Sequence, residues 1–116
     1  MSDDAIVTRV TSASVGMPGR SINTARSNVF VIDSPTVGEA LGSGEAFLAG
    51  VSSCGVTLIE GQAQRLGMPL ERLQVAIEGV RAKDRPMNFS HINMRFEFRG
   101  VTPAQAQELL ALYQGN

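Results

Sequence analysis

Cysteine is almost absent from the sequence, since Cys54 is the only one among 116 residues. One cysteine cannot form a disulfide within the chain, which excludes the disulfide framework of small secreted proteins. Tryptophan is absent, and there is a single tyrosine. The core must therefore be built from aliphatic side chains and five phenylalanines. A thin core in a small chain is often completed by a second copy of the chain.

Charge of one sign and long apolar runs are also missing. The formal net charge is −1 with no block of like charges, so the sequence offers no basic surface for nucleic acid or an anionic membrane. The longest apolar-leaning segment, residues 46–59, is too short to span a bilayer. Residues 1–4 are acidic and do not resemble a signal peptide. These absences predict a cytoplasmic protein that binds neither nucleic acid nor membrane. His91 stands alone, and no nucleotide-binding motif occurs, so neither a metal nor a cofactor is predicted.

Alternating and β-branched patterns predict strands on both sides of a long helix. A first strand is expected over residues 5–15, and residues 20–26 and 28–33 are expected to form a hairpin or a bent pair of strands. Residues 29–32 are apolar on both faces, which predicts a strand covered on both sides. Later in the chain, residues 72–81 and 92–99 alternate apolar and polar side chains, and we expect them to pair as an antiparallel hairpin.

Two helices are predicted. Residues 45–66 form the longer one, which Gly67 and Pro69 end. Its many small residues predict tight packing on more than one side, as a central buried helix would require. The second helix opens with a capping box that starts at Thr102. Elements in the order β-β-β-α-β-β-α, in one domain of residues 1–116, indicate the α+β class. Six residues of the longer helix share one predicted apolar face: Phe47, Gly50, Val51, Cys54, Leu58 and Gly61.

Several of these segments, in this order and spacing, resemble the OsmC/Ohr family of osmotically inducible and organic hydroperoxide resistance proteins. They are the segments 30–35, 45–56, 66–71 and 102–110. In that family a glutamate precedes a helical cysteine by nine residues, and Glu45 and Cys54 hold this spacing. The resemblance covers most of the chain from about residue 20. It implies an OsmC-like fold in which two small antiparallel sheets surround a long central helix in an intertwined homodimer.

The sequence departs from the family pattern in two places. Members with peroxidase activity carry a second, resolving cysteine in a Cys-Pro motif after the last helix, and this sequence reaches Asn116 about where that motif would begin. A natural single-cysteine protein and a shortened sequence both fit this observation. Ser43 stands where the family usually has a proline before the glutamate.

The resemblance implies thiol-dependent reduction of organic hydroperoxides through Cys54. A thiol attacks a peroxide as the thiolate, which needs a nearby cation to persist away from water. Arg20 and Arg26 both lie where the family supplies such an arginine, and Glu45 would orient the guanidinium. The attack would leave a sulfenic acid, and in the absence of a second cysteine an external thiol or dithiol would reduce it.

Other interpretations of the same residues stay open. Cys54 also fits an inert core residue, because free cysteines are among the most buried side chains. Glu45 also fits a carboxylate that stabilises the start of a helix, and both arginines fit a solvated strand face. The alternative function is a catalytically silent OsmC-like dimer that binds a small apolar ligand in its interface pocket.

Overall fold

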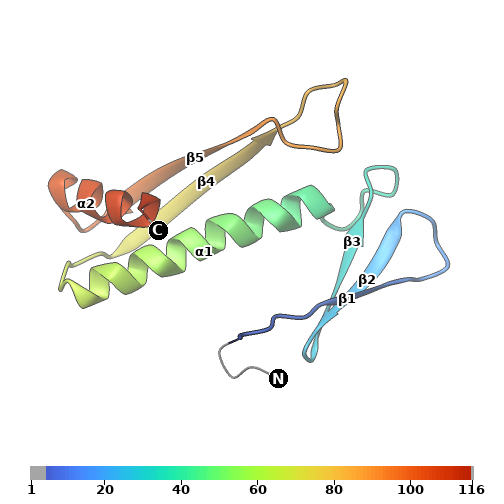
Figure 1. The fold of residues 1–116 in the computed structure, drawn as a ribbon, viewed down its shortest axis with the longest axis horizontal. Coiled ribbons are helices and arrows are strands. Elements are labelled where there is room, and N and C mark those ends of the chain that lie inside the picture. The colour runs from blue at the N-terminus through green and yellow to red at the C-terminus, as the bar shows by residue number, and fades with distance from the viewer. Residues whose placement is uncertain (1–4, 116) are drawn as a thin grey trace. The chain divides into compact units, whose positions relative to one another are not determined.

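The computed structural model describes residues 5–115 (Figure 1). Its element order is the predicted one, and the α+β class is confirmed. The chain divides into two compact units, of which the first ends at Ala46 and the second begins at Phe47. Residues 1–4, in which no leader is predicted, lie outside the described residues. The elements are β1 (Thr11–Ser14), β2 (Arg20–Ala25), β3 (Asn28–Asp33), α1 (Ser43–Arg65), β4 (Arg72–Val80), β5 (His91–Arg99) and α2 (Pro103–Gln114).

The first unit is an antiparallel sheet in the order β1-β2-β3. The hairpin of β2 and β3 is confirmed, with Ala25 opposite Asn28 at its turn. The first strand is shorter than the predicted 5–15, because its ladder begins with Thr11 opposite Thr24. β2 ends at Ala25, one residue after Thr24, so residues before Val10 have no partner strand along which to continue.

The apolar run of β3 is not covered on both sides in the single chain, contrary to the prediction. Val29 is 60% exposed and Phe30 is 39% exposed. Residues 5–46 hold one sheet and only the first turn of α1, so the first unit has no second layer that would bury these side chains. A strand with two apolar faces and a single packed layer leaves hydrophobic surface in water.

The second unit is built on the antiparallel hairpin of β4 and β5, which confirms the predicted pairing. Alternate residues of both strands point to one face, with Leu73 opposite Phe98 and Val75 opposite Phe96. Both helices pack on this face, α1 running along the strands (Figure 1). The buried cluster at the centre contains one residue from β4, one from α2 and two from α1: Leu73, Leu109, Ile59 and Ala63.

The buried face of α1 is not the one that the apolar spacing predicted. Gly55, Ile59 and Ala63 are its buried residues, whereas Cys54 and Leu58 are exposed. The sequence pattern misleads here because apolar and small residues surround most of the helix, so that 3.6-residue spacing fits two faces equally well. We call the predicted and largely exposed set the cysteine face: Phe47, Gly50, Val51, Cys54, Leu58 and Gly61.

The glycines of α1 have different surroundings. At Gly55 an added methyl group would lie 3.2 Å from the Tyr113 hydroxyl oxygen, so the absence of a side chain lets α2 approach α1 closely. Gly50 and Gly61 have open space where a side chain would lie. Close packing on more than one side of α1 is therefore not present in the single chain.

The helix α2 begins with the predicted capping box. The Thr102 side chain accepts a hydrogen bond from the Gln105 backbone N–H at 3.1 Å, and the Gln105 side chain accepts one from the Thr102 N–H at 3.0 Å. Leu109, on the inner side of α2, is completely buried. Among residues 5–115, neither helix combines the length and the apolar character needed to cross a membrane.

Candidate functional site

Cys54 lies near the middle of α1, and it is exposed in the single chain. The single chain therefore does not bury Cys54, and Cys54 is not part of the core of that chain. The buried neighbour is Gly55, one residue further along the helix. Within residues 47–115 the thiol has no hydrogen-bond partner, while the Cys54 backbone oxygen accepts from Thr57 Oγ1 at 3.2 Å.

The surroundings of Cys54 on α1 are apolar. Phe47 and Leu58 belong to the same face and are 54% and 51% exposed. The Phe47 ring stacks on Phe89 with the ring centroids 6.1 Å apart, and the Arg81 guanidinium lies 4.4 Å from the Phe89 centroid. The thiol thus lies on a mainly apolar face of α1, and Phe47 at one end of this face is held by the aromatic pair.

Arg20 is held firmly within the first unit. It opens β2 and lies opposite Asp33, the last residue of β3. Its Nε donates to Asp33 Oδ1 at 2.7 Å and its Nη2 to Asp33 Oδ2 at 2.8 Å, the two-pronged geometry that fits a carboxylate best. Nη2 also donates to Glu39 Oε1 at 2.8 Å. Within residues 5–46, the second terminal nitrogen of Arg20, Nη1, makes no hydrogen bond.

Asp33 is the buried anchor of this cluster, with 2% of its surface exposed. Besides Arg20, the backbone N–H groups of Glu39 and Ala40 donate to Asp33 Oδ2 at 3.1 and 2.7 Å. The hydrogen bonds from Arg20, helped by these N–H groups, hold the pKa of Asp33 well below its usual range although desolvation opposes them. The same contacts with Asp33 and Glu39 raise the pKa of Arg20 above its usual value. Arg20 and Asp33 are therefore both charged at neutral pH.

Arg26 occupies a very different place. It is the first residue of the two-residue turn between β2 and β3, and its φ is +58°. Residues other than glycine rarely adopt this region, but tight hairpin turns require it. Arg26 is exposed, with its backbone committed to the turn.

Glu45 lies in the first turn of α1. Its Oε1 accepts a hydrogen bond from the Gly42 backbone N–H at 2.8 Å, and the Gly42 oxygen accepts from the Ala46 N–H at 2.9 Å. This is half of a capping box, so the contacts are those of the helix-start interpretation. Within residues 5–46, the carboxylate of Glu45 makes no ion pair with either arginine.

The structure thus joins Arg20 to Asp33 and Glu39, two acids that the sequence analysis did not select. A signal for Asp33 was present. Counting outward from the turn at residues 26 and 27 sets Ala25 opposite Asn28, and the same count reaches Arg20 opposite Asp33. Glu39 follows in a loop, where no periodic pattern could indicate its contact with Arg20. Across residues 5–115, no cluster of three or more His, Cys, Asp or Glu side chains is arranged to hold a metal ion.

The model of the OsmC-like protein family matches residues 36–115, which include Glu45 and Cys54. Arg20 and Arg26 lie before the matched residues. No curated protein matches the chain significantly.

Solved structures of the same name share the fold. An OsmC-like protein from Mycoplasma pneumoniae is 14% identical with a TM-score of 0.84, covering 96% of this chain and 82% of that one. An OsmC-like protein of unknown function from Vibrio cholerae is 14% identical with a TM-score of 0.78, covering 97% and 90%. An organic hydroperoxide resistance protein OsmC from Legionella pneumophila, described as a predicted redox protein, is 15% identical with a TM-score of 0.71, covering 95% and 83%. At these identities the likeness shows the fold.

Proposed function

Because this chain belongs to the OsmC-like protein family, we propose that it reduces organic hydroperoxides through Cys54 as a cytoplasmic homodimer. The observation that carries the proposal is an accessible thiol on the apolar cysteine face of α1. Such a surface suits the hydrocarbon part of an organic hydroperoxide, and the thiol that would attack the peroxide group belongs to the same surface. The hydroperoxide resistance protein among the similar structures supports the same chemistry.

The proposed reaction has two stages. The Cys54 thiolate attacks one peroxide oxygen, the O–O bond breaks, and the leaving alkoxide takes up a proton to become the alcohol. Cys54 is oxidised to the sulfenic acid. An external thiol then condenses with the sulfenic acid to give a mixed disulfide and water, and a second thiol releases Cys54 in its reduced form. A dithiol would supply both steps.

Arg20 is the better of the two candidate cations. Its guanidinium is oriented by Asp33, and Nη1 keeps two N–H groups available within residues 5–46. Glu39 would have to give up its contact, because two carboxylates more than balance one guanidinium. Its side chain is 73% exposed, so water replaces the contact readily, while Asp33 keeps the fork in place.

A homodimer is proposed because the single chain leaves two apolar surfaces in water, the cysteine face of α1 and the outer residues of β3. Glu45 and Cys54 are nine residues apart on α1, which is two and a half turns and directs their side chains to opposite sides of a helix. An active site that used both residues would therefore draw them from two chains. This requirement fits an intertwined dimer.

The proposal is tested with purified protein, an organic hydroperoxide and an excess of dithiothreitol. We expect peroxide consumption that Cys54→Ser abolishes, and a dimedone adduct on Cys54 when the reductant is omitted. Serine is close to cysteine in size and Cys54 lies outside the buried core cluster of the single chain, so the substitution should leave the fold and the dimer intact. If Cys54→Ser still consumed peroxide, the reacting residue would have to be one other than Cys54.

The arginine assignment has its own test. An ordinary thiol is only a few per cent thiolate at neutral pH, so loss of the supporting cation should slow the peroxide reaction by up to about 30-fold. Arg20→Gln should show this loss near pH 7 and recover at alkaline pH, where the thiol ionises unaided. Arg26→Gln is the matched control and should react at the normal rate. Equal rates for both variants would remove Arg20 from the mechanism.

In the alternative function, the protein is a dimer that binds a small apolar ligand and does not react with peroxide. The exposed Phe47 and Leu58 beside Cys54 favour binding of an apolar ligand as such. A protein that leaves Cys54 as a free thiol under excess hydroperoxide, yet binds an apolar fluorescent probe, would support this alternative over the peroxidase.

A further inference from the structure

Two arginines face each other at one end of the β4–β5 hairpin. Arg72 opens β4 and lies directly opposite Arg99, which closes β5. Leu73 and Phe98, the next residues inward, point to the buried face, so the alternation of strand residues turns both arginines to the outer face. Like charges directly opposite each other across two strands are destabilising.

Neither guanidinium has a counterion in the part of the chain that the structure describes. No carboxylate pairs with Arg72 or Arg99, in contrast to Arg20. Arg72 Nη2 makes one long side-chain hydrogen bond, 3.4 Å to Gln74 Oε1, and the Arg99 side chain makes none within residues 5–115. The hairpin therefore ends in two exposed cations with unused donors.

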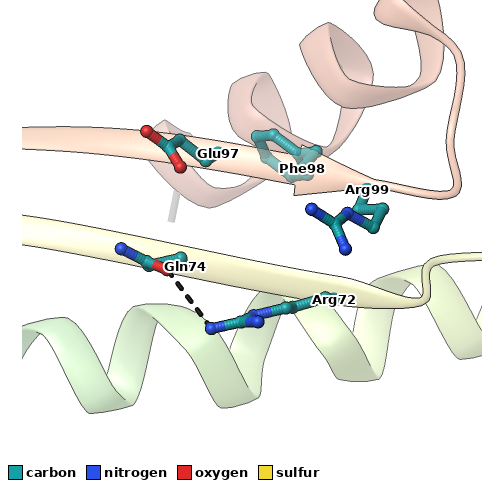
Figure 2. A pocket seen from close by; sticks show the side chains of 5 residues that line it. All are labelled: Arg72, Gln74, Glu97, Phe98 and Arg99. Atoms are coloured by element: carbon teal, nitrogen blue, oxygen red, sulfur yellow. Dashed lines mark hydrogen bonds between the residues drawn. The ribbon is translucent and has the colours of Figure 1, made fainter.

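These side chains border a pocket of about 130 Å³. Figure 2 shows Arg72 and Gln74 on β4 and Arg99 and Glu97 on β5, with both guanidinium groups toward the same end of the hairpin. The register sets Gln74 opposite Glu97, so the pocket has two cations at one end and an amide and a carboxylate further along. Phe98 also lines it.

We propose that this pocket binds a small oxyanion that also carries a hydroxyl group, such as inorganic phosphate or a hydroxy acid. Two guanidinium groups supply the forked N–H donors that phosphate and carboxylate oxygens accept. The charges sum to +1, because Glu97 opposes the two arginines. Glu97 is an acceptor only, so it favours an anion whose own hydroxyl donates to it over one without a donor. The site is independent of Cys54 and of the proposed peroxide chemistry.

The test is an NMR titration of the full chain, labelled with ¹⁵N, at constant ionic strength. Sodium phosphate, glycolate and acetate are the three ligands, and sodium chloride is the reference. We expect saturable shifts of the amides of residues 72–74 and 97–100 with phosphate and glycolate, and weaker binding of acetate. The relative affinities of phosphate and glycolate show whether the pocket prefers inorganic phosphate or a hydroxy acid. Shifts no larger than those in chloride, or acetate binding as tightly as both hydroxylated anions, overturn the proposal.

Matched variants locate the site. Arg72→Gln and Arg99→Gln should each lower the phosphate affinity about tenfold or more, as loss of one charge-assisted hydrogen bond would. Arg95→Gln is the control, because Arg95 lies on the same outer face of β5 opposite Ala76 and outside the pocket. Glu97→Ala should erase the preference for hydroxylated anions. A loss in Arg95→Gln as large as in Arg72→Gln would mean diffuse attraction and would refute a site.

The unfolding temperature is a second measurement, because the arginine substitutions and phosphate should each change it in a specified direction. Without added anion, Arg72→Gln and Arg99→Gln should unfold at or above the temperature of the unaltered protein, because repulsion between the arginines has been removed. Phosphate should then raise the unfolding temperature of the unaltered protein and of Arg95→Gln, and not that of Arg72→Gln or Arg99→Gln. A stabilisation by phosphate that is the same in all four proteins contradicts the assignment.

Discussion

Truncating Leu58 should weaken self-association of the chain if the cysteine face of α1 is a dimer interface. Leu58 is 51% exposed in the single chain, so about half of its side chain remains to be buried by a partner. Complete burial of a leucine side chain is worth about 1.5–3 kcal/mol, and half of this is about 1 kcal/mol.

The symmetry of a dimer doubles this contribution. A two-fold interface contains each residue twice, so Leu58→Ala should cost about 2 kcal/mol of association free energy, or about 30-fold in the dissociation constant. Leu58→Glu should have a larger effect, because it would also bury two carboxylates near each other.

Sedimentation equilibrium over a range of protein concentrations measures the dissociation constant directly. Met87→Ala is the matched control, since Met87 is another large apolar residue, 89% exposed, in the loop between β4 and β5. Leu58→Ala that associates as tightly as Met87→Ala would refute the assignment of the interface to the cysteine face.

Two further predictions concern the two units separately. Leu109→Ala should lower the free energy of unfolding by about 2–5 kcal/mol in urea denaturation, because Leu109 is completely buried, whereas Glu108→Ala on the exposed side of α2 should stay within about 0.5 kcal/mol. Near-equal values for the two variants would contradict a core that contains Leu109. The lowered pKa of Asp33 means that the unfolded chain binds its proton first, so the stabilisation from Asp33 is present at neutral pH and is lost as the pH falls below about 4. Urea midpoints of the unaltered protein and Asp33→Asn, measured from about pH 6 to about pH 2, should converge at the acid end, and a constant gap between them would show that Asp33 has an ordinary pKa.

Much of the fold followed from local patterns that tertiary contacts do not override. The alternation that ends at Arg99 and the capping box at Thr102 each specify a local geometry, and both occur where expected. The first strand was overextended for a reason outside its own composition. Residues 5–9 favour a strand, but β2 ends at Ala25, opposite which Val10 would lie, and leaves them no partner.

The candidate site was harder to predict because its geometry depends on register and on which side of a helix is buried. Hydrophobic spacing identified Cys54 as part of an apolar face, yet Ile59 belongs to another apolar face that packs on the hairpin instead. The pairing of Arg20 with Asp33 can be predicted only after the two strands are aligned from their turn.

The close fit of Tyr113 over Gly55 has a spectroscopic consequence. Tyr113 is the only tyrosine, and the chain has no tryptophan. Its ring meets Phe96 edge-on at 5.7 Å between centroids, and its hydroxyl rests where α1 lacks a side chain. All tyrosine emission therefore comes from the seam between α2 and α1. The intrinsic fluorescence of the unaltered protein therefore reports, without a label, whether α2 is packed against α1.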